Sequence, residues 1–468
     1  MMETSSEPQA NPYLSGPIAP LFFKTAAPIV LLMLVSGLFT VVDAIFLGVY
    51  VGPRALAAVT LVFPLFMALN ALATLVSSGM ASILARRLGG GDRAGAQSAM
   101  QSATALAMVA ALALMAFYLA AGRPLIGWLS GGDAALAAMA STYIALLIFG
   151  SPLQFLISIQ GDTLRSEGRP GTMALIGVLV TLANIGFNFI FIALWGWGVA
   201  GSAIGTLAAQ LLALVAVVVL RLSGRTPIRL WEHTGKPLTE AWGRTLALGL
   251  PSSLSLIGIS LSTACILVSV KAWFGTDYDL TIAAYGIASR LLTFVFLPLM
   301  GLNFACQSIV GNNYGAAIYE RSNRTLVVGL VTGLFYGLIV QAVFLFAAGP
   351  IAALFVDDPE TIAATTHIVR IITAAYVVVA PVMVLAGYFQ AIGKAVSAGV
   401  MSLGRTYFFN IPLIFLLPFL FGSQGIWMAA PSSDIAMLGL VAAVLWFHGR
   451  RSGARWGVFH QEAAAVMR

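Results

Sequence analysis

Twelve long apolar runs limit the fold of this chain more than any other feature of its sequence. Each is long enough for an α-helix to cross a hydrocarbon layer about 30 Å thick, which takes about 20 residues. A transmembrane barrel would show short alternating segments instead. The runs lie near residues 18–48, 55–85, 97–121, 136–161, 171–194, 198–221, 244–271, 281–311, 326–348, 362–391, 398–420 and 425–448. They predict an all-α polytopic membrane protein with twelve transmembrane helices.

The charge content supports the same class. Only 9% of the 468 residues are charged, whereas soluble domains carry about 25%. So few charges could not cover the surface of a large soluble enzyme. The net charge of +7 comes from basic residues between apolar runs. We therefore expect the lipid bilayer as a partner, and no nucleic acid.

The basic residues also predict the topology. With the N-terminus inside, 18 of the 24 Lys and Arg residues fall on the cytoplasmic side. The other six are Arg54, Arg123 and Lys271 in outer loops and Arg290, Arg370 and Arg405 within spans. This bias follows the positive-inside rule. We expect a multi-pass membrane protein with both termini in the cytoplasm.

The two halves of the chain resemble each other. Five matched pairs follow in the same order, with an offset between 223 and 230 residues. They are Pro28 with Pro251, LAAVT (56–60) with IAAYG (282–286), ASILARRLG (81–89) with QSIVGNNYG (307–315), SPLQFLISIQ with APVMVLAGYFQ (from Ser151 and Ala380), and NIGFNFIFI with NIPLIFLLP (from Asn184 and Asn410). Each half holds an even number of spans, so both enter the membrane in the same orientation.

This repeat predicts two pseudo-symmetric six-helix lobes around a central cleft. The polar stretch between the sixth and seventh spans is the expected linker. The predicted division is an N-terminal tail (1–15), an N-terminal lobe (16–222), a cytoplasmic linker (223–243), a C-terminal lobe (244–448) and a basic C-terminal tail (449–468). Paired bundles around a cleft are the usual plan for alternating access, with the substrate near the membrane midplane.

Seven ordered motifs resemble those of the multidrug and toxic compound extrusion (MATE) family, and they span about residues 16–448. They are VVDAIFLGVYVGPRALAAVTLVFP, ASILARRLGGGDRAGA, DTLRSEGRPGTMALIGVLVTLAN, GWGVAGSAIGT, IAAYGIASRLL, QSIVGNNYGAA and GIWMAAPSSD. Within the family the chain is most similar to the bacterial DinF-like branch. The resemblance implies export of organic compounds driven by inward flow of H⁺ or Na⁺.

The resemblance also implies a cation-coupling site in the first lobe. The essential acid of the first helix corresponds to Asp43. The polar pocket around it corresponds to Tyr143, Asn184, Asn188 and Thr206, with Gly161 or Asp162. Two positions depart from the branch pattern: Asn188 stands where an Asp is usual, and Gly161-Asp162 where two Asn are frequent. The spans that carry acids in the NorM-like branch's second lobe hold none here, so we do not expect a cation site of that type.

Asp43 stands out on physical grounds as well. An acid inside an apolar span costs about 2.5–3.5 kcal/mol on insertion scales. An apolar environment disfavours the ionised form, which suits a group that binds and releases a proton. The alternative is an acid at the outer end of the span that reaches solvent. For Asn184 and Asn188, which share a helix face, the alternative to coupling is a hydrogen bond between helices.

The other candidates each have a structural alternative. Thr206 lies in a run of small residues that could serve packing. Tyr143 could bond an acid or anchor at the interface. Asp162 could face the pocket or sit at the cytoplasmic end, near Arg165 and Arg169.

The substrate-cleft candidates are Asp434, Gln307, Met67, Phe66 and Arg290. Asp434 could attract cationic compounds or pair with Arg405 or Arg290, because charges within a membrane need partners. Phe66 and Met67 could line an adaptable pocket or simply pack.

The predicted function is cation-coupled antiport (H⁺ or Na⁺) of organic, cationic or amphipathic compounds by a monomer. The missing second carboxylate favours H⁺ over Na⁺. No nucleotide-binding loop, GxSxG elbow or HExxH helix occurs, so an ATP-driven pump or an enzyme is not expected. Neither the cysteines nor the histidines have metal-site spacing, so we expect no metal and no cofactor. The alternatives are a lipid-linked precursor flippase of the related superfamily, and a membrane enzyme or receptor.

Overall fold

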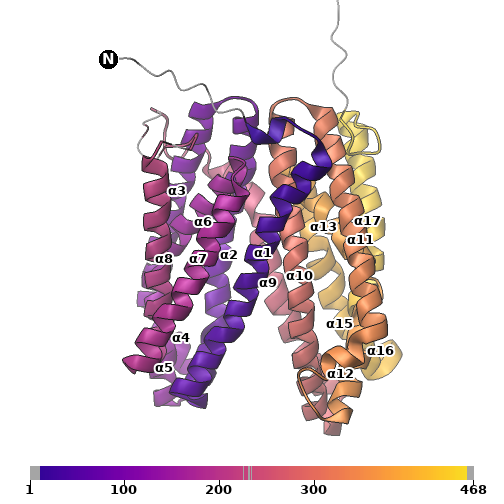
Figure 1. The fold of residues 1–468 in the computed structure, drawn as a ribbon. Coiled ribbons are helices and arrows are strands. Elements are labelled where there is room, and N and C mark those ends of the chain that lie inside the picture. Colours follow the sequence, from indigo (N-terminus) through magenta and orange to yellow (C-terminus); the bar gives the residue numbers. More distant parts are fainter. Residues whose placement is uncertain (1–10, 225, 230–231, 233–234, 461–468) are drawn as a thin grey trace, which may run out of the picture. The chain divides into compact units, whose positions relative to one another are not determined.

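The computed structural model describes residues 11–224, 226–229, 232 and 235–460, and these are almost entirely helical (Figure 1). Residues 1–10 and 461–468 of the predicted tails lie outside the described residues, as do positions 225, 230, 231, 233 and 234 of the predicted linker. The chain divides into two compact units. The first contains residues 1–249 and 308–318; the second contains residues 250–307 and 319–468.

The first half of the chain begins with a short turn and continues through helices joined by tight connections. Its elements are η1 (Pro12–Leu14), α1 (Ile18–Phe46), η2 (Leu47–Val51), α2 (Pro53–Gly89), α3 (Arg93–Phe117), η3 (Tyr118–Gly122), α4 (Arg123–Leu129), α5 (Ala134–Phe149), α6 (Ser151–Ser166), α7 (Pro170–Asn188), η4 (Phe189–Leu194) and α8 (Gly198–Leu222). Helix α7 packs against both α1 and α8 (Figure 1).

The second half repeats this order of long helices. Its elements are α9 (Trp242–Trp273), η5 (Gly275–Asp277), α10 (Tyr278–Gly315), α11 (Tyr319–Ala352), α12 (Pro359–Ile372), α13 (Tyr376–Ala391), α14 (Ala395–Leu403), η6 (Gly404–Asn410), α15 (Ile411–Leu416), α16 (Pro418–Phe421), η7 (Gly422–Gln424) and α17 (Gly425–Ser452). The lobe boundaries inferred from the sequence repeat stay a prediction.

Within the described residues, nine helical segments are long and apolar enough to cross a membrane, and two bent pairs raise this number to eleven. One of the nine, Ala395–Arg451, has 57 residues. It would be about 85 Å long if straight, far beyond one hydrocarbon thickness. Its chain turns at Gly422, where φ is +63°, and α15 packs back on α17. Two spans therefore lie in this segment, and the total equals the twelve predicted.

The fourth and tenth spans are bent, which the apolar pattern did not predict. Helices α5 and α6 meet at 49°, and α12 and α13 meet at 50°. The first bend lies at Gly150, and Pro152 follows it in the first turn of α6. Proline lacks the N–H that would continue the helical ladder, so a break is favoured immediately before it.

Four π-helical segments widen the helices within the described residues. They are η2 after α1, η3 after α3, η4 after α7 and η6 after α14. Such wide turns are rare and recur at functional sites. Around η4 four aromatic rings stack, with centroid separations of 5.8 Å for Phe187–Phe191, 5.1 Å for Phe191–Trp197 and 4.9 Å for Trp195–Trp197.

Each unit has its own apolar core. Met80, Leu84 and Phe155 are buried in the first unit, and Trp427 and Phe344 in the second. Such cores fix the helices that carry the polar side chains described below.

The last turns of α10 belong to the first unit. Arg165 Nη1 donates to Ser308 Oγ at 2.8 Å, and Asn312 Nδ2 donates to the Ser166 carbonyl at 3.1 Å. Here two backbones touch. A Cβ at Gly89 would lie 1.9 Å from the Asn312 carbonyl oxygen, and a larger residue is therefore excluded.

Three helices begin with an acidic N-cap residue that lies outside the membrane spans. Asp92 accepts from Gly95 N at 2.8 Å, Asp133 from Leu136 N at 3.0 Å and Asp358 from Thr361 N at 2.9 Å. These caps satisfy N–H groups that have no partner inside the helix. Hydrogen bonds from Arg87 and from the Gly95 N–H hold the pKa of Asp92 below its usual value.

Candidate functional site

Asp43 lies in the last turn of α1, directly before η2, and is half-buried. Its Oδ1 accepts two hydrogen bonds, from Asn188 Nδ2 at 2.7 Å and from Ser202 Oγ at 3.0 Å. Asp43 forms no ion pair with any residue that the structure describes. A carboxylate held only by neutral donors keeps its charge uncompensated, so a bound cation would change the local balance strongly.

Hydrogen bonds connect this contact to further predicted residues. Asn188 Nδ2 also donates to Asn184 Oδ1 at 3.2 Å, and Asn184 Nδ2 donates to Thr206 Oγ1 at 3.1 Å. Thr206 in turn donates to the Ser202 carbonyl at 3.1 Å. Together with Ser202, the structure brings Asp43, Asn188, Asn184 and Thr206 into one set from three helices, which we call the Asp43 cluster.

One acceptor in the cluster is unused. Asn188 Oδ1 is buried and receives no hydrogen bond from the described part of the chain. Gly205 makes room for it, because a Cβ there would lie 2.4 Å from this oxygen. A buried oxygen without a donor is costly, and a proton on Asp43 or a bound cation would satisfy it.

Tyr143 lies beside the cluster and Asp162 lies away from it. The phenol of Tyr143, on α5, is buried and interacts with Asp43 and Ser202. Asp162 pairs with Arg165 through its Oδ1, at 2.8 Å from Nη2 and 3.2 Å from Nε. A Cβ at Gly161 would lie 3.8 Å from Met173 Cγ, with no other atom within 4 Å.

Sequence reasoning missed Ser202, which is fully buried and bonds Asp43 directly. A signal was present, since Ser202, Thr206 and Gln210 are spaced by four and share one face of α8. Gln210 extends this polar face: its Nε2 donates to Gln154 Oε1 at 3.4 Å, and Gln154 Nε2 donates to Asn70 Oδ1 at 2.7 Å.

The second unit holds a different arrangement. Asp434 on α17 accepts two bonds from Arg405 on η6, at 2.5 Å from Nε to Oδ1 and 3.3 Å from Nη2 to Oδ2. The Asp434 side chain is 2% exposed, and the Arg405 side chain is 33% exposed. Arg290, also a candidate, is exposed on α10 and forms no ion pair with a described acid.

The remaining cleft candidates are dispersed. Gln307 is buried in α10 and donates to Gln390 Oε1 at 2.7 Å; Gln390 Nε2 donates to Ser252 Oγ at 3.1 Å. Phe66 is half-buried on α2 and packs on the core of the first unit. Met67 is also half-buried on α2.

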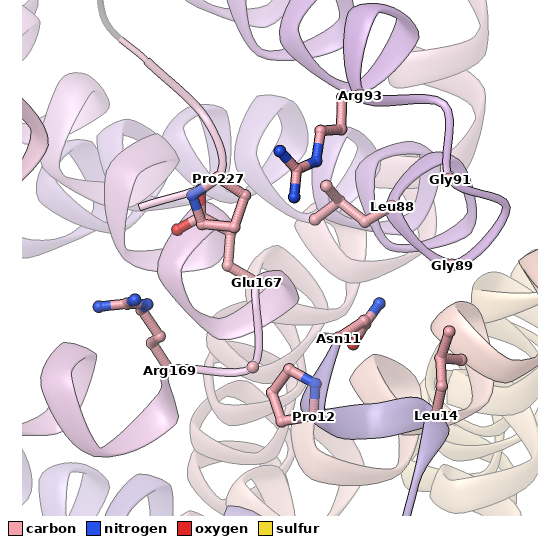
Figure 2. A pocket seen from close by; sticks show the side chains of 11 residues that line it. Asn11, Pro12, Leu14, Leu88, Gly89, Gly91, Arg93, Glu167, Arg169 and Pro227 are labelled. Atoms are coloured by element: carbon pink, nitrogen blue, oxygen red, sulfur yellow. The ribbon is translucent and has the colours of Figure 1, made fainter. Parts of the chain in front are cut away.

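A cavity of about 620 Å³ lies in the first unit, apart from these residues. Figure 2 shows Asn11, Leu88, Glu167 and Pro227 around it. None of the predicted site residues lines this cavity. Across the described residues, no three His, Cys, Asp or Glu side chains are grouped so that they could hold a metal ion.

Comparison with known proteins adds a family match. A sequence model of the MatE family matches residues 28–190 and 251–416. The two matched segments begin 223 residues apart, within the offset of the internal repeat. The same family pattern is therefore present in both halves of the chain.

Two characterised relatives match over most of their length. The FAD transporter of Shewanella oneidensis is 24% identical over 431 residues, which cover 91% of this chain and 93% of that protein. The multidrug export protein MepA of Staphylococcus aureus is 23% identical over 444 residues, which cover 93% of this chain and 95% of that protein.

Solved structures share the fold. A crystal structure of MATE in complex with MaL6 aligns with a TM-score of 0.87 at 23% identity, over 96% of this chain and 99% of the other. An outward-facing multidrug resistance MATE transporter aligns with a TM-score of 0.86 at 24% identity, over 95% and 98%. The predicted all-α polytopic fold is confirmed.

Proposed function

The chain belongs to the MatE family, and from this premise we propose that it exports organic compounds by antiport with a cation, H⁺ or Na⁺. As a member of this family it is a membrane transporter and not an enzyme. Amphipathic compounds, cationic ones included, are the proposed substrates, and the proposed location is the bacterial inner membrane with both termini in the cytoplasm. The excess of basic residues on that side supports this orientation.

The Asp43 cluster is the proposed cation site, and one observation carries this proposal. Asp43 has only neutral donors, and the neighbouring Asn188 Oδ1 lacks a donor among the described residues. A proton on Asp43 would let the carboxyl donate a hydrogen bond to Asn188 Oδ1. Na⁺ would instead need several oxygens around it, and Asp43 is the only carboxylate with a described contact in the cluster. A proton therefore needs fewer ligands at this site than Na⁺ does, which agrees with the preference for H⁺ predicted from the sequence.

The proposed cycle uses this site as a switch. In the outward-open state the cation binds Asp43 and the exported compound leaves. The loaded first lobe then favours the inward-open state, the cation is released to the cytoplasm, and a new compound binds. A ligand shifts such an equilibrium only through its different affinity for the two states. The hydrogen bonds of Asn188 and Ser202 to Asp43 are the contacts that cation binding would rearrange.

The test is ethidium transport in proteoliposomes with pH and Na⁺ gradients imposed separately. Asp43→Asn is expected to reduce gradient-driven transport by at least a hundredfold, because an amide cannot take up a proton and offers Na⁺ no negative charge. Asp133→Asn, which changes an exposed carboxylate outside the spans, is the matched control and should keep wild-type transport. Gradient-driven transport by a folded Asp43→Asn protein would refute the mechanism. Lipid scrambling without ethidium transport would indicate a flippase.

A further inference from the structure

The membrane segments of the second unit carry more positive than negative charge. Arg290 and Arg405 lie inside α10 and η6, and Arg370 lies in the last turn of α12, whereas Asp434 is the only described acid of this unit that lies in a helix beyond its first turn. Charged groups at this depth are expensive and usually mark a functional site. The excess of arginine means that one Asp cannot compensate this interior.

The reachable member of the Arg405–Asp434 pair is the arginine. Asp434 is 2% exposed and has both oxygens covered by the guanidinium, whereas the Arg405 side chain is 33% exposed. A ligand approaching this place meets a cation and not a carboxylate. It also meets unused donors, because Arg405 Nη1 forms no hydrogen bond with a described residue.

The accessible guanidinium needs a polar environment. Facing lipid, it would lose several kcal/mol of hydration, so its accessible side is more stable towards water or a ligand. The wide π-helical turn η6 carries it, and Gly404 lets this turn approach α17: a Cβ at Gly404 would lie 2.5 Å from Leu440 Cδ2. The phenol of Tyr376 is close enough to interact with Arg405 electrostatically.

From this geometry we propose that Arg405 is the centre of a subsite for an anionic group, a carboxylate or a phosphate, on the transported compound. The planar guanidinium matches both groups through paired N–H donors. Asp434 holds the fork in place while the subsite is empty, and an incoming anion shares or replaces it. The substrates would then include amphipathic anions and zwitterions as well as cations. This inference rests on the proposed export function and specifies its substrate class.

The test compares an anionic and a cationic probe in one preparation. Carboxyfluorescein and ethidium uptake are measured in proteoliposomes under the same imposed gradient, and the ratio of the two rates is the readout. Arg405→Gln is expected to lower the anion-to-cation ratio at least tenfold. Asp434→Asn is expected to raise it about threefold, because the guanidinium loses its internal competitor. Lys271→Gln, an exposed basic residue at the end of α9, is the control and should leave the ratio unchanged.

A purely structural ion pair would not shift the anion-to-cation ratio in opposite directions in the two variants. If Arg405→Gln and Asp434→Asn move the ratio in the same direction, or not at all, the subsite is refuted. Arg405→Gln with Asp434→Asn replaces the pair by two neutral side chains of similar shape. This double variant should have the low ratio of Arg405→Gln even if the single variant is unstable.

Two further measurements separate the outcomes. Competition by 4-methylumbelliferyl phosphate, with uncharged 4-methylumbelliferone as control, shows whether phosphate is accepted as well as carboxylate. Equilibrium binding of carboxyfluorescein to purified wild type and Arg405→Gln does not depend on transport. Loss of binding in the variant, with no wild-type transport of either probe, would retain the subsite and refute the export function. Equal binding to both proteins would refute the subsite.

Discussion

Each unit holds a carboxylate within its membrane segments, but the two have different hydrogen-bond partners. Asp43 in the first unit accepts hydrogen bonds from an amide and a hydroxyl. Asp434 in the second accepts both of its described bonds from Arg405. A carboxylate with neutral donors can gain a cation and lose it again, whereas one that already holds a guanidinium has its positive partner built in. Two related halves can therefore divide cation binding and substrate recognition between them.

The largest expected difference between the two arrangements is the loss of stability when each acid is removed. Asp434→Leu is expected to lower the free energy of unfolding by about 3 kcal/mol, because Arg405 remains in a membrane segment without its partner. Asp43→Leu should cost only about 1 kcal/mol, because the loss of its two hydrogen bonds is largely offset by removing an uncompensated charge from a membrane segment. Thermal unfolding in detergent measures both, and Arg405→Met combined with Asp434→Leu should recover most of the loss. An equal cost for the two acids would remove the contrast.

A substitution beside the Asp43 cluster tests its geometry without touching a charge. Gly205→Ala places a Cβ 2.4 Å from Asn188 Oδ1 in the present arrangement, so Asn188 must move away from Asp43. Overpacking of this kind costs about 2 kcal/mol, and ion-driven ethidium transport should fall at least tenfold. Gly186→Ala on α7 is the matched control, since nothing lies within 4 Å of a Cβ there. Wild-type transport by Gly205→Ala would contradict the role of Asn188.

A single hydroxyl allows a finer measurement. Ser202→Ala removes one of the two hydrogen bonds to Asp43 Oδ1. A bond to a charged group is worth about 1.5 kcal/mol, so the carboxylate should bind its cation more tightly when this bond is absent. The cation concentration for half-maximal transport is expected to fall about tenfold. Ser141→Ala, which changes a hydroxyl bonded to Tyr118, should leave it unchanged. A rise after Ser202→Ala would mean that Ser202 binds the cation itself.

The smallest effect should come from an acid outside the membrane segments. Arg87 and the Gly95 N–H depress the pKa of Asp92, so its contribution to stability is present above the unfolded-state pKa and is lost as the pH falls through the folded-state pKa. Because the pair is well exposed to solvent, Asp92→Asn should cost about 0.5 kcal/mol at pH 7. Thermal unfolding of the two proteins should converge at acidic pH, below the folded-state pKa of Asp92. A difference that persists there would assign the effect to something other than charge.

The sequence predicts most of this arrangement because helix spacing and scarce charge are both visible in it. Asp43 is conspicuous in an apolar run, and Asn184 and Asn188 share a face by their spacing. Ser202 was not predicted, because a serine in a run of small residues is typical of a position that serves helix packing. Asp162 could not be placed, since it lies near a helix end where a fraction of a turn decides the direction of a side chain.

Other features depend on information that hydropathy does not contain. The bends between α5 and α6 and between α12 and α13 change helix direction without changing apolar character. The π-helical turns η4 and η6 shift the register of the helices that contain them, and no residue pattern in the sequence predicts this shift. The pairing of Asp434 with Arg405 and not with Arg290 follows from where η6 aims the side chain, and it was one of two alternatives at the level of sequence.

The aromatic stack around η4 has a practical consequence for optical spectroscopy. Trp195 and Trp197 lie 4.9 Å apart, and the stack extends through Phe191 to Phe187, the residue before Asn188. Any rearrangement of Asn188 when Asp43 takes up a cation is thus adjacent to a closely coupled pair of indoles. Their fluorescence and near-ultraviolet circular dichroism would provide a label-free signal for the proposed cation binding, to be assigned by Trp195→Phe and Trp197→Phe.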